Sequence, residues 1–311
     1  MSAVVRSEAI ATSEALANGM TLAYRYDGPP SGRPVMLIHG LGQTLVDWPE
    51  DFIDRLAGAG CRLLRFDNRD AGRSSRMDHL GAPPLLSLWL SAALRLPAPT
   101  RPPYSIADMA ADVVALLDTL DVGSVHLVGA SMGGMIAQRI AVAHPKRVLS
   151  LTSIMSSSGA PGLPGPRKDV LAAFTSDAGQ DGLANAEERA RRFRRLIGGT
   201  LKDGDLVELE HRVAESTAYG WPPGDGATRQ YAAILADRDR HRLLSRIRAR
   251  CLVVHGEEDP LLPLAHGLDT AARIPGSRIL ATRHMGHEIT LSNAQIIADE
   301  ILEHLAADER R

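Results

Sequence analysis

Short apolar runs alternate with amphipathic segments along most of the chain. The apolar runs are too short for buried helices and are bounded by turn residues, so they predict buried strands. These strands are expected at 21–26, 35–39, 62–66, 125–128, 148–155, 252–255 and 278–281. Segments with apolar residues at helical spacing separate them, at 51–59, 108–121, 135–141, 264–274 and 294–305. This alternation predicts the α/β class, with a mostly parallel central sheet and helices on both faces.

Two segments interrupt the alternation. The segment 80–104 is rich in proline and leucine, and its apolar run is too short and too interrupted to span a bilayer. A flap over a cleft, an oligomer contact and a surface helix packed on the body are open alternatives for it. The segment 159–240 opens with the run GAPGLPGP, which can continue neither a strand nor a helix, and goes on with helical patterns at 185–197 and 205–216. The expected division is a core of residues 1–158 and 241–311 with an inserted helical cap of residues 159–240.

Ser131 stands at the centre of the pentapeptide GASMG, between the expected strand 125–128 and the expected helix 135–141. A strand, a tight turn and a helix together project the serine hydroxyl into a cleft as a nucleophile. Gly129 and Gly133 suit this turn, because a side chain at either position would collide with the neighbouring strand and helix. Glycine and serine are also common in turns for purely conformational reasons, so the motif needs support from elsewhere in the chain.

That support comes from the residues that a nucleophilic serine needs. Serine requires a general base within hydrogen-bond reach, and a carboxylate must orient the base. Asp259 follows the strand 252–255, and Pro260 fixes the turn immediately after it. His287 follows the last expected strand and is preceded by a glycine. The order Ser131, Asp259, His287 along the chain is the order that this type of serine motif requires.

Other polar residues nearby compete for the same roles. Glu257 and Glu258 precede Asp259, and their simplest interpretation is that they solvate the loop. His284 competes with His287, but a surface or supporting position suits it better. His39 ends the strand 35–39 just before a glycine, where it is expected to brace a loop by hydrogen bonding.

Two backbone amides are expected to stabilise the oxyanion of a tetrahedral intermediate. The apolar run that begins at Pro34 ends in the glycine-rich loop 39–42, and Leu41 lies in this loop. Met132 directly follows the serine. The N–H groups of Leu41 and Met132 are therefore the candidate oxyanion hole.

The chain resembles the α/β-hydrolase-fold serine hydrolases. The resemblance rests on HGLG at 39–42, DNRDAGRS at 67–74, GASMG at 129–133, Asp259 and His287. The 67–74 and 129–133 sequences are also similar to those of bacterial esterases of the aclacinomycin methylesterase group. This resemblance implies an acyl-enzyme mechanism without a cofactor, and a structural role for the 67–74 loop.

The expected activity is the hydrolysis of carboxylic esters of small to medium apolar substrates. Lactones, thioesters, amides and activated C–C bonds can be cleaved by the same residues and stay open. A slow-turnover ligand-binding or sensor protein on the same fold is a second class of function. Epoxide hydrolysis and haloalkane dehalogenation are disfavoured, because the resemblance implies an aspartate nucleophile for those reactions and this chain has a serine.

Substrate contacts are harder to assign from the sequence. Met155, Trp221 and Met285, together with Tyr219, are candidate pocket walls, with core packing as the alternative. The helical pattern 185–197 carries an arginine cluster, for which an anionic ligand and an ordinary solvated helix are the two interpretations. The members are Arg189, Arg191, Arg192, Arg194 and Arg195. The neighbouring Glu187 and Glu188 favour the solvated helix.

Composition and charge limit the remaining classes of partner and location. The chain of 311 residues carries 35 Lys and Arg against 37 Asp and Glu, a net charge of -2, so a nucleic-acid partner is not expected. Cys61 and Cys251 each precede a strand-like run and are expected to be buried thiols. No metal-ligand pattern is visible. The first residues lack a continuous apolar stretch, so the expected location is the cytoplasm, and a homo-oligomer is possible.

Overall fold

The structure is a computed structural model that describes residues 11–94, 96, 100–175, 183–220 and 225–306. In these residues eight strands form one sheet in the order β1-β2-β4-β3-β5-β6-β7-β8. They are β1 (Ser13–Ala17), β2 (Met20–Asp27), β3 (Arg33–Ile38), β4 (Cys61–Phe66), β5 (Val125–Ala130), β6 (Val148–Ile154), β7 (Arg250–Gly256) and β8 (Arg278–Thr282). The pairs β1·β2 and β2·β4 are antiparallel and the others are parallel. The predicted α/β class is confirmed.

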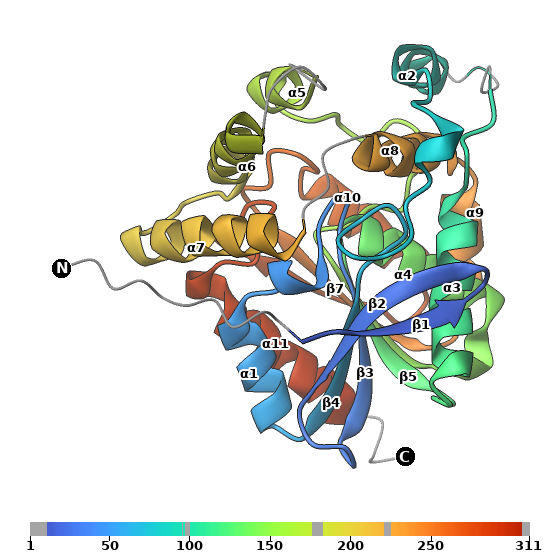
Figure 1. Cartoon of the computed structure of the whole chain (residues 1–311), viewed down its shortest axis with the longest axis vertical. Coiled ribbons are helices and arrows are strands. Elements are labelled where there is room, and N and C mark those ends of the chain that lie inside the picture. Colours follow the sequence, from blue (N-terminus) through green and yellow to red (C-terminus); the bar gives the residue numbers. More distant parts are fainter. Residues whose placement is uncertain (1–10, 95, 97–99, 176–182, 221–224, 307–311) are drawn as a thin grey trace.

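Helices cover both faces of this sheet (Figure 1). They include α1 (Glu50–Gly58), α3 (Ile106–Thr119), α4 (Met132–Ala143), α10 (Ala265–Arg273) and α11 (Leu291–Ala306). The central strand β3 shows why its sequence is apolar at successive positions. Val35 and Leu37 pack in the cluster that contains α1 and α11, whereas Met36 and Ile38 pack in the cluster that contains α3 and α4. A strand buried on both faces has no polar side.

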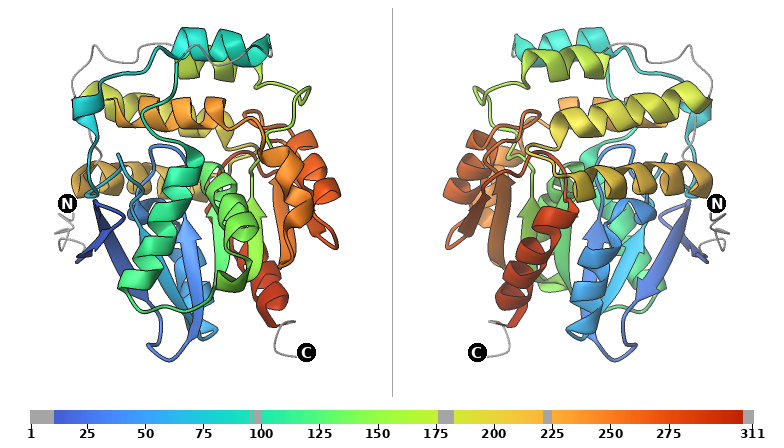
Figure 2. Two further views of the ribbon diagram at one scale, coloured as in Figure 1. Left: turned by 90° about the vertical axis from the view of Figure 1, so that its right-hand side faces the viewer. Right: turned by 90° about the vertical axis from the view of Figure 1, so that its left-hand side faces the viewer.

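The segment between β6 and β7 is helical. It contains α5 (Lys168–Thr175), α6 (Leu183–Ile197), α7 (Asp203–Tyr219), α8 (Gly226–Ala236) and α9 (Arg240–Leu243). Figure 2 shows that α5, α6 and α8 stack over the end of the sheet that lies away from the C-terminus. Of these helices the sequence pattern predicted α6 and α7. Short 3-10 turns occur at η1 (Leu45–Asp47), η2 (Asp78–Leu80), η3 (Pro145–Arg147) and η4 (Leu244–Arg246).

The proline- and leucine-rich segment contains α2 (Leu85–Ala93), which packs beside α8 (Figure 1). Leu88 is fully buried there, and Arg238 donates a hydrogen bond of 2.7 Å to the Ser91 hydroxyl. Leu86 is 72% exposed on the other side of the helix, and Trp89 is also exposed. The segment therefore contains a surface helix packed on the body by one side only.

Cys61 and Cys251 are both free and buried, as predicted, and burial raises the pKa of the Cys251 thiol to about 12. Within the described ranges, no helix combines the length and the hydrophobicity needed to cross a bilayer.

Candidate active site

Ser131 lies at a sharp turn between β5 and α4. Its φ of +53° and ψ of -117° place the backbone in a region that L-residues rarely adopt. A β-carbon at Gly129 would overlap the carbonyl of Gly133, and one at Gly133 would overlap the Ile38 carbonyl of β3. The collision with helix and strand that the sequence predicts is therefore present, and it explains why both positions are glycine. The turn holds the serine hydroxyl at the end of the sheet.

The structure brings Ser131, His287 and Asp259 together from the ends of three strands. His287 Nε2 lies 2.9 Å from Ser131 Oγ, and His287 Nδ1 lies 2.7 Å from Asp259 Oδ2. The carboxylate can only accept, so Nδ1 donates to it and Nε2 is left to accept the serine proton. Asp259 Oδ1 accepts the N–H groups of Leu261 and Leu262 at 2.9 and 2.8 Å, which fixes the carboxylate. Such an arrangement can activate a serine as a nucleophile.

The glycine-rich loop 39–42 lies directly against the serine. A β-carbon at Gly40 would be 3.3 Å from the Ser131 β-carbon. Gly40 N–H donates to His39 Nδ1 at 2.8 Å, so His39 braces this loop as expected. The next amide, that of Leu41, has no acceptor among the described residues. Met132 is the first residue of α4, so its N–H also has no intrahelical acceptor.

Residues 33–294 match the family described as the alpha/beta hydrolase fold. The chain belongs to this family. The rhodomycin D methylesterases DnrP of Streptomyces peucetius and DauP of Streptomyces sp. (strain C5) are each 31% identical to it, and each alignment covers 90% of this chain and 93% of the relative. The predicted membership and the resemblance to methylesterases are thus confirmed. Among solved structures, a hydrolase from Pseudomonas aeruginosa PA01 is 25% identical with a TM-score of 0.68, covering 96% of this chain and 99% of its own.

In the present chain, the end of α6, in the helical segment between β6 and β7, holds the loop that carries His287. Residues 197–200, at the end of α6 and directly after it, run beside 284–287, and Gly199 forms an isolated antiparallel bridge with Met285. The His287 N–H donates to the Ile197 carbonyl at 2.6 Å, and the Gly286 N–H donates to Gly198 at 3.1 Å. The position of the imidazole therefore depends on the end of α6.

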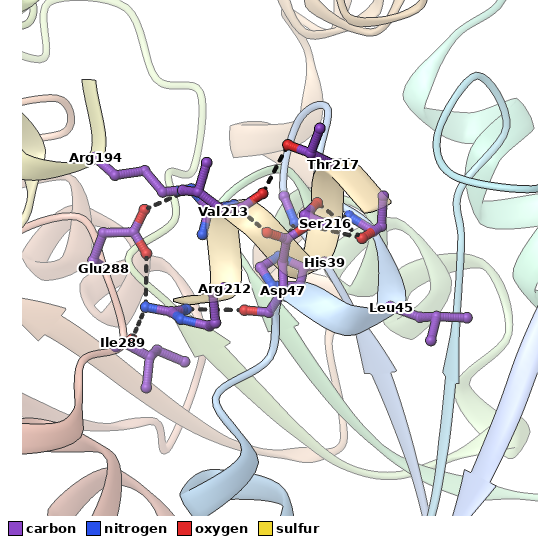
Figure 3. A network of polar contacts seen from close by, with 12 residues as sticks. His39, Leu45, Asp47, Arg194, Arg212, Val213, Ser216, Thr217, Glu288 and Ile289 are labelled. Atoms are coloured by element: carbon purple, nitrogen blue, oxygen red, sulfur yellow. Dashed lines mark hydrogen bonds and ion pairs between the residues drawn. The ribbon is translucent and has the colours of Figure 1, made fainter. Parts of the chain in front are cut away.

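A buried ionic network joins the same helices to the core (Figure 3). Arg194 of α6 pairs with Asp47 of η1, and Arg212 of α7 donates to the Asp47 carbonyl at 2.9 Å. Both guanidinium groups also approach Glu288, next to His287, at 3.8 and 3.7 Å. Burial alone would raise the pKa of Asp47, but Arg194 and its other partners lower that pKa to about 2. The network therefore holds charged groups, which stabilise one another only while the inserted helices stay in place.

Arg194 corrects one interpretation made from the sequence. Arg191, Arg192 and Arg195 do form the solvated pairs expected of an ordinary helix, with Glu187, Glu188 and Glu210. Arg194 is only 7% exposed, and the solvated-helix interpretation is wrong for it. Its spacing from the buried Ala190 and Ile197 places it on the apolar stripe of α6. This spacing is the feature of the sequence that could have indicated a buried Arg194.

His284 and Glu258 contact each other outside the group formed by Ser131, His287 and Asp259. His284 Nδ1 lies 3.1 Å from Glu258 Oε1, and the other carboxylate oxygen accepts the Thr200 hydroxyl at 2.8 Å. His284 thus occupies the exposed supporting position that the sequence analysis favoured. Glu258 does more than solvate its loop, because it ties the turn before Asp259 to the connection after α6.

The 67–74 loop makes structural contacts. Asp67 accepts the N–H groups of Leu45 and Arg73 at 2.7 and 2.9 Å, and the Tyr219 hydroxyl at 2.8 Å. Burial raises the pKa of Asp67 to about 6 in spite of these donors. The Asn68 amide donates to the His39 carbonyl at 3.2 Å. The loop therefore supports both the glycine-rich loop and α7.

The candidate pocket walls are mostly occupied by other contacts. Met155 and Met285 are buried in the apolar cluster of α1 and α11, in agreement with the core-packing alternative. Tyr219 is buried with its hydroxyl on Asp67. Trp221 lies outside the described residues. Among the residues that the structure describes, no group of three or more His, Cys, Asp or Glu side chains is placed to hold a metal ion.

Proposed function

We propose that this hydrolase is a serine-dependent esterase that cleaves carboxylic esters of small to medium apolar substrates. The observation that carries the proposal is the chain of contacts from Ser131 Oγ to His287 Nε2 and from His287 Nδ1 to Asp259. Membership of the alpha/beta hydrolase fold family and the similarity to rhodomycin D methylesterases support it. Those relatives make methyl esters the first substrates to examine.

The proposed reaction has two halves. Ser131 Oγ attacks the ester carbonyl carbon while His287 Nε2 takes its proton, and Asp259 stabilises the imidazolium that forms. The amides of Leu41 and Met132 donate to the oxyanion of the tetrahedral intermediate. His287 then returns the proton to the departing alcohol. In the second half His287 activates water, which hydrolyses the acyl-enzyme and releases the acid.

The helices of residues 159–240 are proposed to act as the cap that shapes the substrate space above Ser131. Their place over the end of the sheet (Figure 2) supports this role. A cytoplasmic location is part of the same proposal, since buried free thiols such as Cys61 suit a reducing compartment.

The decisive experiment measures initial rates on p-nitrophenyl esters from acetate to palmitate, and on methyl esters. Ser131→Ala should lower kcat by about a million-fold, as triad deletions do in other serine hydrolases. Ser277→Ala, at the far end of the sheet, serves as the matched control and should keep wild-type turnover. Activity of Ser131→Ala near that of the wild type would overturn the assignment. A folded wild type inactive on every ester would point to amide or C–C hydrolysis, or to a binding protein.

A further inference from the structure

Gln230 of α8 is fully buried and contacts the glycine-rich loop. Its Oε1 accepts the Gly42 N–H at 2.8 Å, and its Nε2 donates to the Arg69 carbonyl at 2.8 Å. These partners fix the orientation of the amide, since an N–H can only be accepted by the oxygen and a carbonyl can only accept from the nitrogen. One side chain therefore links the loop beside Ser131 to the 67–74 loop.

The helix that carries Gln230 is itself anchored. The adjacent residue, Arg229, is buried and pairs with Asp70 through two hydrogen bonds of 2.8 and 2.7 Å. The same guanidinium contacts Asp78 at 2.8 Å. Because α8 is tied to the core at the position next to Gln230, the Oε1 atom is held in place rather than being free to follow the loop.

The bond to Gly42 determines which amide the loop presents to Ser131. The N–H groups of Gly40 and Gly42 are both occupied, by His39 and Gln230, and the Leu41 amide between them is left without an acceptor among the described residues. Gly42 has a φ of +68°, and as a glycine it can change this angle at little cost. Without the bond to Gln230 the Gly42 N–H would lose its acceptor, and the Leu41–Gly42 part of the loop would be held only through Gly40.

We propose that Gln230 is a positioning residue for the oxyanion hole, holding the loop so that the Leu41 N–H points at the carbonyl oxygen of the substrate. The inference rests on the proposed esterase function. An oxyanion donor acts mainly in the transition state, so its displacement lowers kcat and leaves KM nearly unchanged. The inserted helices thus contribute to catalysis through α8 as well as to the shape of the substrate space.

The test compares three substitutions on the best ester found for the wild type. Gln230→Met has a similar volume but no acceptor, and Gln230→Asn is polar but too short to reach Gly42. Both should lower kcat by about 10- to 100-fold at nearly constant KM, the range expected for a misplaced oxyanion donor. Gln230→Glu keeps an acceptor for the Gly42 N–H but loses the donor to the Arg69 carbonyl, so its kcat should fall less than that of Gln230→Met. A trifluoromethyl ketone, which forms an oxyanion adduct with the serine, should lose affinity by the same factor as kcat/KM.

Gln138→Leu is the matched control. Gln138 is also fully buried and makes two side-chain hydrogen bonds, with Ser153 and Arg240, but it does not contact the glycine-rich loop. This variant should unfold at lower urea concentration and keep its kcat where it is folded. Wild-type kcat in folded Gln230→Met or Gln230→Asn would overturn the inference, as would an equal loss of kcat in Gln138→Leu. A wild type without Ser131-dependent turnover would instead show that the proposed function itself is wrong.

Discussion

His39 is a buried histidine whose ring holds the glycine-rich loop. Its Nδ1 accepts the Gly40 N–H, and its ring lies against Trp48 with 4.5 Å between ring centroids. Burial lowers the pKa of His39 from 6.5 to about 4, although Asp47 opposes this shift. The ring is therefore neutral at pH 7, and neutrality allows Nδ1 to accept a hydrogen bond.

This pKa makes the stability of the protein depend on pH. Between pH 6.5 and about 4 the unfolded chain binds a proton at His39 that the folded chain does not, so acidification favours unfolding. The full shift corresponds to about 3 kcal/mol of stability, present above pH 6.5 and lost as the pH falls to about 4. In urea unfolding at several pH values, the free energy of unfolding of His39→Gln should fall less steeply with decreasing pH than that of the wild type. The exposed His79→Gln should keep the wild-type slope, and equal slopes in all three proteins would contradict this account.

Gly133 gives a prediction about close packing. A β-carbon there would overlap the Ile38 carbonyl, so Gly133→Ala should force β3 and α4 apart and lower stability by about 1–3 kcal/mol. Gly123 has nothing within 4 Å of the corresponding position, and Gly123→Ala should change stability little. Urea midpoints of the two variants measure the difference. A Gly133→Ala protein as stable as Gly123→Ala would show that the turn has room that the structure does not give it.

At the scale of elements, α6 is attached to the core through a buried ion pair. Arg194→Met leaves the carboxylate of Asp47 buried without its cation, and we expect a loss of about 3–5 kcal/mol. Arg192→Met removes an exposed pair with Glu188 and should cost less than about 1 kcal/mol. Chemical denaturation of both variants measures these values.

The double variant Asp47→Asn/Arg194→Met separates the pair from its surroundings. Because the uncompensated charge is gone, it should be more stable than Arg194→Met alone, and the two single losses should not add. Strict additivity in this double-mutant cycle would mean that the two side chains do not interact, contrary to the contacts drawn in Figure 3.

Much of the fold and of the candidate active site could be predicted from local sequence. The strands and core helices were predictable because their apolar spacing is regular, and Ser131, Asp259 and His287 each follow a strand at the same edge of the sheet. Gln230 was not predictable, since its partners are 188 and 161 positions away and nothing in its own neighbourhood marks it. Strand β1 was also missed, because its buried residues are the small Ala15 and Ala17 and its one large apolar residue, Leu16, is exposed.

On the scale of the whole molecule, the inserted helices and the core should unfold together. Arg212 of α7 donates to carbonyl groups of η1 and of Ile289, and Tyr219 at the end of α7 bonds to Asp67. Hydrogen exchange in α7 should therefore require an opening free energy close to that of the central strands. The surface helix α2 should exchange faster, because only one of its sides is packed. Exchange in α7 as fast as in α2 would show that the insertion opens by itself.

The pairing of 197–200 with 284–287 limits how this enzyme can be recombined with its relatives. The helical segment between β6 and β7, which we propose to be the cap, would be the segment to exchange in order to change substrate preference. A chimera made that way would replace residues 197–200 with those of another protein. The N–H groups of Gly286 and His287 would then lose the carbonyl partners that fit them in this chain. Productive chimeras should therefore inherit 284–289 and 159–240 from the same parent. The two segments should therefore be exchanged together, although more than 40 residues separate them in the sequence.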